Sequence, residues 1–75
     1  MIKRKYEVYI DCADCARKVE DAVNEFGDIK SACVDFLRQV MLVEFYDFAD
    51  IYDLEDEINR RCKKIDPDFE MSLKS

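Results

Sequence analysis

The first half of the chain changes its hydrophobic period from that of a strand to that of a helix. Alternating apolar residues predict a first strand over residues 5–10, because every second side chain of a strand faces the same side. A helix is expected next, and its apolar residues recur three or four positions apart at Ala16, Val19, Val23 and Phe26. Gly27 is expected to end this helix in the left-handed conformation that glycine favours.

The second half continues with two strands, a helix and a last strand. The inward faces of the two strands are expected to carry Ala32, Val34 and Phe36 in one, and Met41, Val43 and Phe45 in the other. A tight turn near residues 37–39 joins them, and either Asp50 or Asp53 caps the helix. Pro67 prevents that helix from continuing. Its inward stripe is Leu54, Ile58, Cys62 and Ile65, and the last strand alternates at Phe69, Met71 and Leu73.

This order of elements predicts an α+β fold of the ferredoxin-like βαββαβ type, with residues 1–75 forming one domain. Right-handed crossovers give a four-stranded antiparallel sheet with both helices on one face. One end of the sheet then holds three segments: the end of the first strand, the turn between the next two strands and the turn after the second helix. The loop after the first strand is therefore expected beside residues 65–68. Cys33, at the start of the second strand, is expected at the opposite end.

Composition and charge limit the classes of function. Apolar residues make up 49% and charged residues 40% of the 75 residues, with one Gly and one Pro, which indicates regular elements joined by short turns. The net charge of −6 disfavours binding to nucleic acid or anionic membranes and favours a cationic ligand or a basic partner. No signal peptide or membrane-inserting segment is expected, so the protein is predicted to be cytoplasmic, alone or tethered to a membrane transporter.

The strongest chemical signal is a C-x-x-C pair, Cys12 and Cys15, between the first strand and the first helix. Backbone N–H groups and the positive end of the helix dipole lie there, and both favour the thiolate, which is the form that binds metal. In a reducing cytosol, four cysteines indicate metal or redox chemistry rather than a disulfide framework. The pair is therefore expected to bind one metal ion.

Residues 10–20, Ile-Asp-Cys-Ala-Asp-Cys-Ala-Arg-Lys-Val-Glu, resemble the metal-binding loop and first helix of the heavy-metal-associated domain family. This family includes copper chaperones, mercury-binding periplasmic proteins and the N-terminal domains of heavy-metal P-type ATPases. The order of elements agrees over nearly the whole chain, and residues 32–36 resemble the family's second strand. Tyr9 departs from the pattern, because the family usually has Gly there.

Asp11 and residues 63–68 make the chain most similar to the members that export zinc, cadmium or lead. The resemblance implies a metal site of Cys12, Cys15 and Asp11 that binds Zn²⁺, Cd²⁺ or Pb²⁺, with Cu⁺ as the alternative. Ligand chemistry agrees, because two thiolates complete a linear Cu⁺ site, whereas a divalent ion of borderline softness takes about four ligands, including oxygen. A solvated turn carboxylate or a helix cap is the other interpretation of Asp11.

Two roles are compatible with such a site. The protein is expected to be the cytosolic N-terminal domain of a zinc, cadmium or lead exporting ATPase, or else a free-standing metallochaperone for copper or zinc. Its partner is then the transporter core or another C-x-x-C domain, which receives the ion by ligand exchange. A thiol–disulfide redox protein is a less favoured alternative, because no aromatic residue precedes the first cysteine and no Gly-Pro separates the two. The domain itself is not expected to be an enzyme, since it has no His and no nucleophile paired with a base.

The remaining reactive residues are expected to have mainly structural roles. Cys62 falls on the inward stripe of the second helix and is predicted to be buried, whereas Cys33 is predicted to be an exposed thiol. Asp14 is a candidate helix cap. Asp66 and Asp68 are expected in a solvated turn, from which either could supply an oxygen ligand.

Overall fold

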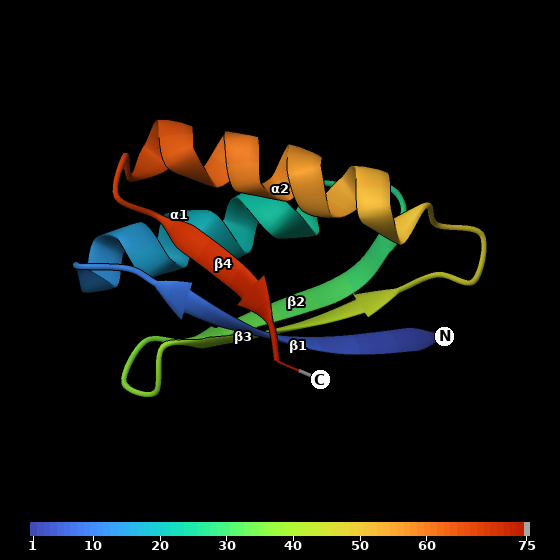
Figure 1. The fold of residues 1–75 in the computed structure, drawn as a ribbon, viewed down its shortest axis with the longest axis horizontal. Coiled ribbons are helices and arrows are strands. Elements are labelled where there is room, and N and C mark those ends of the chain that lie inside the picture. The colour runs from blue at the N-terminus through green and yellow to red at the C-terminus, as the bar shows by residue number, and fades with distance from the viewer. Residues whose placement is uncertain (75) are drawn as a thin grey trace.

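The computed structural model describes residues 1–74, which form four strands and two helices in the predicted order. The elements are β1 (Ile2–Tyr9), α1 (Ala13–Asn24), β2 (Ile29–Asp35), β3 (Val40–Phe45), α2 (Ile51–Ile65) and β4 (Glu70–Leu73). The strands lie in the order β2-β3-β1-β4, and every neighbouring pair is antiparallel. Both helices cover one face of the sheet (Figure 1), so the predicted ferredoxin-like α+β fold is confirmed.

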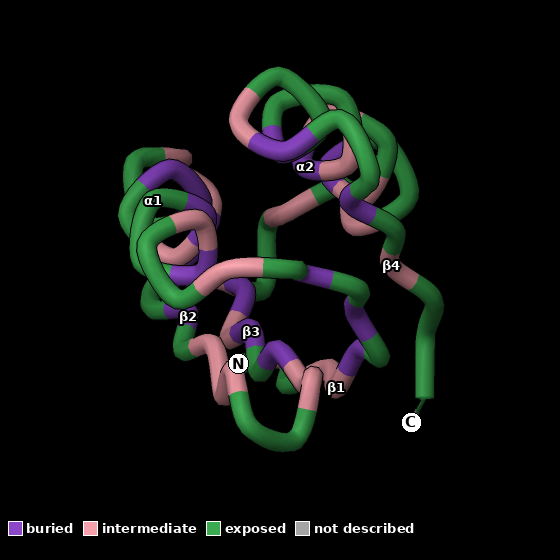
Figure 2. The backbone as a smooth tube through the Cα atoms, turned by 90° about the vertical axis from the view of Figure 1, so that its left-hand side faces the viewer, coloured by how far each residue is buried: buried purple, intermediate pink, exposed green. Residues whose placement is uncertain are grey.

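One apolar core lies between the sheet and the two helices (Figure 2). As the strand and helix periods predict, the buried residues include Met41, Val43, Phe45, Leu54, Ile58 and Cys62. Tyr6 of β1 is also buried, and its hydroxyl donates a hydrogen bond to Glu55 of α2 at 2.7 Å. Burial and this contact raise the pKa of Tyr6 far above its usual range, so the hydroxyl keeps its proton and its one polar end is satisfied.

Two polar side chains of α1 satisfy the free edge of β2. The Asn24 amide accepts a hydrogen bond from the backbone N–H of Ala32 at 2.8 Å and donates one to the carbonyl of the same residue at 3.0 Å. Glu20 accepts a hydrogen bond from the N–H of Val34 at 2.8 Å. Because β2 lies at an edge of the sheet, these contacts occupy backbone groups that would otherwise be open to another strand, and they fix α1 against the sheet.

The helix ends are set by local hydrogen bonds, and α1 ends earlier than predicted. The N–H groups of Glu25 and Phe26 bond to carbonyls three residues back, at 3.2 and 3.3 Å, which closes the last turn tightly. Gly27 therefore needs no left-handed conformation and has no positive φ, so its predicted role as a cap is wrong. The second helix begins after the Asp50 cap and ends before Pro67, as expected. Within residues 1–74, no helix has the length and apolar composition needed to cross a membrane.

Two strands begin earlier than predicted, and the last strand ends on an exposed residue. β1 begins at Ile2, because its basic first half pairs with β3 although the charged residues mask the alternation. β2 begins at Ile29, and a register shift between Ile29 and Ser31 breaks the period of two. Because β2 extends back to Ile29, Cys33 lies in the half of β2 next to the hairpin, where it pairs with Leu42, and not at the opposite end. It is exposed, as expected. Leu73, which alternates with Phe69 and Met71 in the last strand, is 56% exposed at the end of the edge strand β4.

The burial of Cys62 leads to a prediction about stability. Its side chain is fully buried, so Cys62→Ser places a hydroxyl in an apolar site and is expected to lower the free energy of unfolding by about 1 to 3 kcal/mol. Cys33→Ser, a matched change at an exposed position, should have almost no effect. Urea unfolding of the reduced proteins compares the two, and equal losses would contradict a packing role for Cys62.

Candidate metal site

Three connections meet at the end of the sheet where β1 finishes. Figure 1 shows the β1–α1 loop, the β2–β3 hairpin and the α2–β4 turn at the same end of the molecule. Carboxylate oxygens of Asp11 in the loop and Asp66 in the turn lie within 4.8 Å of each other. The expectation that the C-x-x-C loop adjoins residues 65–68 is therefore confirmed.

Gln39 of the hairpin fixes the start of this loop. Its backbone carbonyl accepts a hydrogen bond from the N–H of Val8 at 3.0 Å, and its Oε1 accepts one from the N–H of Ile10 at 2.7 Å. Its Nε2 donates to the carbonyl of Phe36 at 2.7 Å, and its φ of 55° lies in the left-handed region. The sequence did not reveal this residue, because the turn lacks an Asn-Gly signal and the bonded residues are far apart in the chain.

Cys12 is the N-cap of α1. Its backbone is extended, with φ −147° and ψ 150°, and its sulfur accepts a hydrogen bond from the N–H of Cys15 at 3.1 Å. Neither Asp14 nor Asp11 is the cap, so that interpretation of these two residues is wrong. The sulfur that is predicted to bind metal therefore also begins the helix, and this contact holds it at the helix N-terminus.

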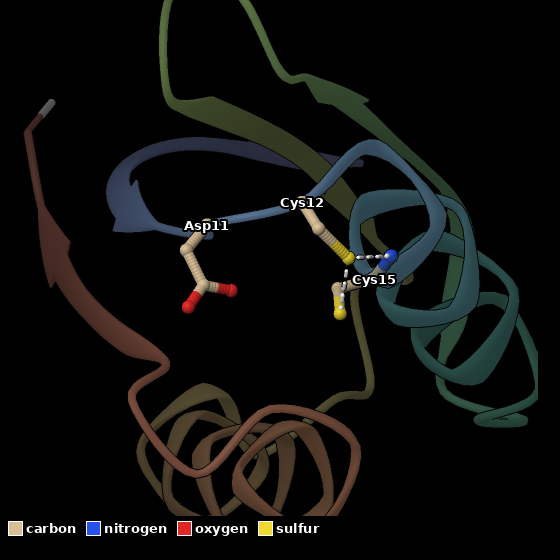
Figure 3. A group of neighbouring side chains, drawn as sticks. All are labelled: Asp11, Cys12 and Cys15. Atoms are coloured by element: carbon tan, nitrogen blue, oxygen red, sulfur yellow. Dashed lines mark hydrogen bonds between the residues drawn. The ribbon is translucent and has the colours of Figure 1, made fainter.

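The two thiols contact each other directly (Figure 3). The Cys12 thiol donates to the sulfur of Cys15 at a sulfur–sulfur distance of 2.7 Å, and both residues are half-buried. This contact, burial and the charges of Asp66 and Asp11 raise the pKa of Cys15 to about 11. At Cys15 in the metal-free protein, these neighbours oppose the helix N-terminus, which was expected to favour the thiolate. At neutral pH, a metal ion must displace the proton from this sulfur.

Asp11 is exposed on the loop directly before the two cysteines (Figure 3). One of its carboxylate oxygens and the sulfurs of Cys12 and Cys15 all lie within 4.8 Å of one another. The nearby Asp66 carboxyl group raises the pKa of Asp11, through the close contact of the two groups and through its negative charge. The loop thus brings together two sulfur atoms and one oxygen, a donor set that suits a borderline divalent ion.

We expected Asp66 to lie in a solvated turn, but the structure shows it buried. Only 4% of Asp66 is exposed, because the α2–β4 turn lies against the metal loop. The backbone N–H of Asp66 donates a hydrogen bond to the carbonyl of Cys62 at 2.9 Å. Its Oδ1 accepts a hydrogen bond from the N–H of Asp68 at 3.0 Å, whereas Asp68 itself is exposed as expected. The sequence does not reveal this burial, because a carboxylate just after an amphipathic helix is usually exposed. Asp66 is buried only because the α2–β4 turn contacts the β1–α1 loop.

The other two cysteines lie apart from this cluster. Burial raises the pKa of the Cys62 thiol to about 12, and Cys33 is exposed. The described part of the chain contains two compact groups of potential metal ligands, Asp11 with Cys12 and Cys15, and Asp11 with Asp66 and Asp68. Neither group includes Cys33 or Cys62, which agrees with their predicted structural roles.

The capping role of Cys12 can be separated from its metal chemistry. Cys12→Ser keeps an acceptor for the N–H of Cys15, whereas Cys12→Ala removes it. In the metal-free state the Ala variant is therefore expected to be less stable than the Ser variant by about 1 kcal/mol. Urea unfolding in the presence of a chelator measures the difference, and equal stability would show that the sulfur does not cap α1.

Solved structures with the same fold include domains of metal transporters. A copper-binding domain of a P-type ATPase matches with 24% identity and a TM-score of 0.73, over 100% of this chain and 96% of that chain. The N-terminal domain of a potential copper-translocating P-type ATPase from Bacillus subtilis, in the Cu(I)-loaded state, matches with 24% identity and a TM-score of 0.75, over 97% of this chain and 86% of that chain. Oxidised MerP from Ralstonia metallidurans matches with 18% identity and a TM-score of 0.75, over 99% of this chain and 97% of that chain. At such identities the likeness shows the fold alone.

Sequence comparison identifies the family. No curated protein matches the chain. The heavy-metal-associated domain matches residues 6–66, a range that contains the C-x-x-C pair and both neighbouring carboxylates, Asp11 and Asp66. The chain therefore belongs to the heavy-metal-associated domain family, a family of metal-binding domains.

Proposed function

We propose that residues 1–75 form one domain that binds a divalent heavy-metal ion, Zn²⁺, Cd²⁺ or Pb²⁺, through Cys12, Cys15 and Asp11. The domain delivers this ion as the cytosolic N-terminal part of a P-type ATPase that exports zinc, cadmium or lead. One observation carries the proposal: a carboxylate oxygen lies within 4.8 Å of both sulfurs, in a chain that belongs to the heavy-metal-associated domain family.

The carboxylate of Asp11 is the reason for preferring a divalent ion. Two thiolates and a carboxylate carry more negative charge than Cu⁺ neutralises, and a divalent ion neutralises more of it. A tetrahedral zinc site uses four ligands at about 2.0 to 2.3 Å, so two sulfurs and one oxygen leave one position for water or for a ligand from a partner. Cu⁺ is satisfied by the two sulfurs and makes no use of Asp11.

A copper-binding role is the second candidate. The sulfurs of Cys12 and Cys15 face each other at 2.7 Å, and side-chain rotations that move them apart would make room for a Cu⁺ ion between them. The structures with the same fold also include copper-binding ATPase domains. In this role the chain would be a domain of a copper transporter or a free-standing metallochaperone, and Asp11 would be dispensable. A thiol–disulfide redox function would use the same two sulfurs and likewise gives Asp11 no role.

Delivery proceeds by ligand exchange at the exposed side of the site. Asp11 is exposed and the two cysteines are half-buried, so a thiolate of the transporter core or of another C-x-x-C domain can approach from the side of Asp11. The incoming thiolate takes the open position and displaces the Asp11 oxygen, after which the two sulfurs leave in turn, with no change in the oxidation state of the metal. The net charge of −6 favours a partner with a basic docking surface, and salt weakens such a complex.

Metal binding is expected to yield one divalent ion per chain, with release of protons. Because the pKa of Cys15 is about 11 in the metal-free protein, its proton must leave when the ion binds. The apparent affinity should therefore fall as pH falls, by about tenfold per pH unit for each proton released. Competition titration with a chromophoric chelator and Zn²⁺ measures both the affinity and the number of ions bound.

The control for this titration is a cysteine outside the site. Cys12→Ser and Cys15→Ser should each lose most of the affinity, whereas Cys33→Ser should keep it, because Cys33 lies outside the ligand group. If both site variants retained the affinity of the parent, the metal would bind elsewhere and the proposed function would fail.

Removing Asp11 tests the choice of metal. Asp11→Ala is expected to weaken Zn²⁺ binding by about 1 to 3 kcal/mol, because it removes a charged oxygen ligand, and to change Cu⁺ binding much less. Asp14→Ala is the matched control, since it removes a neighbouring carboxylate from the first turn of α1 that lies outside the ligand group. Paired competition titrations for the two ions compare the parent with both variants. Equal losses for Zn²⁺ and Cu⁺, or no loss for Zn²⁺, would favour the copper-binding role.

A further inference from the structure

A second group of metal-ligating atoms lies beside the thiols, on the side of the α2–β4 turn. Carboxylate oxygens of Asp11, Asp66 and Asp68 all lie within 4.8 Å of one another. This group contains only oxygen, and it shares Asp11 with the thiol site. Three carboxylates so close together repel one another unless a cation or a proton lies between them.

The buried member of this group, Asp66, is not satisfied by the residues around it. Only 4% of Asp66 is exposed. Its Oδ1 accepts a hydrogen bond from Asp68, but its Oδ2 is shielded from solvent and has no hydrogen-bond partner among the described residues. A buried carboxylate oxygen that lacks both water and a hydrogen-bond partner lowers the stability of the fold, so a group that pairs with Asp66 Oδ2 would stabilise it.

Basic side chains do not supply that partner within residues 1–74. The ion pairs of the described residues involve other acids, namely Glu7, Glu25, Asp35, Asp47 and Asp56. Lys63, on the last turn of α2, donates to the carbonyl of Phe69 at 2.6 Å. The α2–β4 turn therefore presents uncompensated negative charge to the metal loop.

We propose that Asp11, Asp66 and Asp68 form an oxygen-only site for a hard divalent cation such as Mg²⁺, Mn²⁺ or Ca²⁺. Hard cations bind carboxylate oxygens and water, so three carboxylates with water in the remaining positions make a complete coordination shell. Because Asp11 and Asp68 are exposed, the affinity is expected at the weak end for such sites, on the order of 10⁻⁴ to 10⁻³ M. The cation ties the β1–α1 loop to the α2–β4 turn and gives the buried oxygen of Asp66 a partner.

Mn²⁺ is the probe for this site, added to a protein that carries both Cys12→Ser and Cys15→Ser. This protein has no thiol at the metal loop, and the serine at the N-cap keeps the acceptor that begins α1. We expect Mn²⁺ to broaden the amide NMR signals of residues 10–12 and 66–69 in a saturable way that excess Mg²⁺ reverses. Asp66→Asn in this background should weaken Mn²⁺ binding about tenfold or more. Asp56→Asn, at an exposed acid paired with Arg60, is the matched control and should leave binding unchanged.

Several results would overturn the proposal. One is broadening of NMR signals over the whole acidic surface, and another is equal Mn²⁺ affinity in the Asp66→Asn and Asp56→Asn proteins. The third is no broadening at all, which would mean that a proton, and not a cation, pairs with the buried oxygen of Asp66. Asp68→Asn changes an exposed member of the group and should also weaken binding, so it replaces Asp66→Asn if that variant does not fold. All of these proteins lack the C-x-x-C thiols, so the outcome does not depend on the proposed heavy-metal function.

Discussion

The hydrogen bonds between Gln39 and the end of β1 determine where the metal loop begins. Val8 and Ile10 both donate to Gln39, so the chain is held against the β2–β3 hairpin up to Ile10 and turns away from the sheet at the next residue. Asp11 follows at once, and the sulfur of Cys12 then caps α1. The positions of the proposed ligands therefore depend on a hairpin residue that itself ligates nothing.

Crowding of acidic groups gives the metal-free site its electrostatic character. The sulfur–sulfur contact, burial and two carboxylates raise the pKa of Cys15 to about 11, and Asp66 raises the pKa of Asp11. In the metal-free site, these neighbours therefore disfavour the negatively charged forms of Cys15 and Asp11. A divalent cation reverses this preference, because it attracts the same thiolates and carboxylates that repel one another without it. Crowding that is costly in the metal-free protein thus becomes a source of affinity for an ion of higher charge.

The sequence predicts this fold best where the hydrophobic period is uninterrupted. The inward faces of β3 and α2 were correctly predicted, and the order of elements was enough to bring the C-x-x-C loop beside residues 65–68. Prediction failed where a backbone contact decides the outcome: α1 closes without Gly27, and pairing with β3 extends β2 back to Ile29, so Cys33 lies in the half of β2 next to the hairpin. In the candidate site, the cluster of the three proposed ligands was predictable, but the bonds of Gln39 and the burial of Asp66 were not. Both arise where connections distant in the chain meet, and neither period nor composition reports such contacts.

X-ray absorption spectroscopy at the zinc edge of the Zn²⁺-loaded protein tests the central claim most directly, because it reports the elements that ligate the ion and their distances. The proposed site predicts two sulfur ligands, from Cys12 and Cys15, at about 2.3 Å, together with oxygen ligands at about 2.0 to 2.2 Å. An ion held by four sulfurs, as two chains sharing one ion would give, or by oxygen alone, would contradict the claim that Asp11 and the C-x-x-C pair of a single chain hold the metal together.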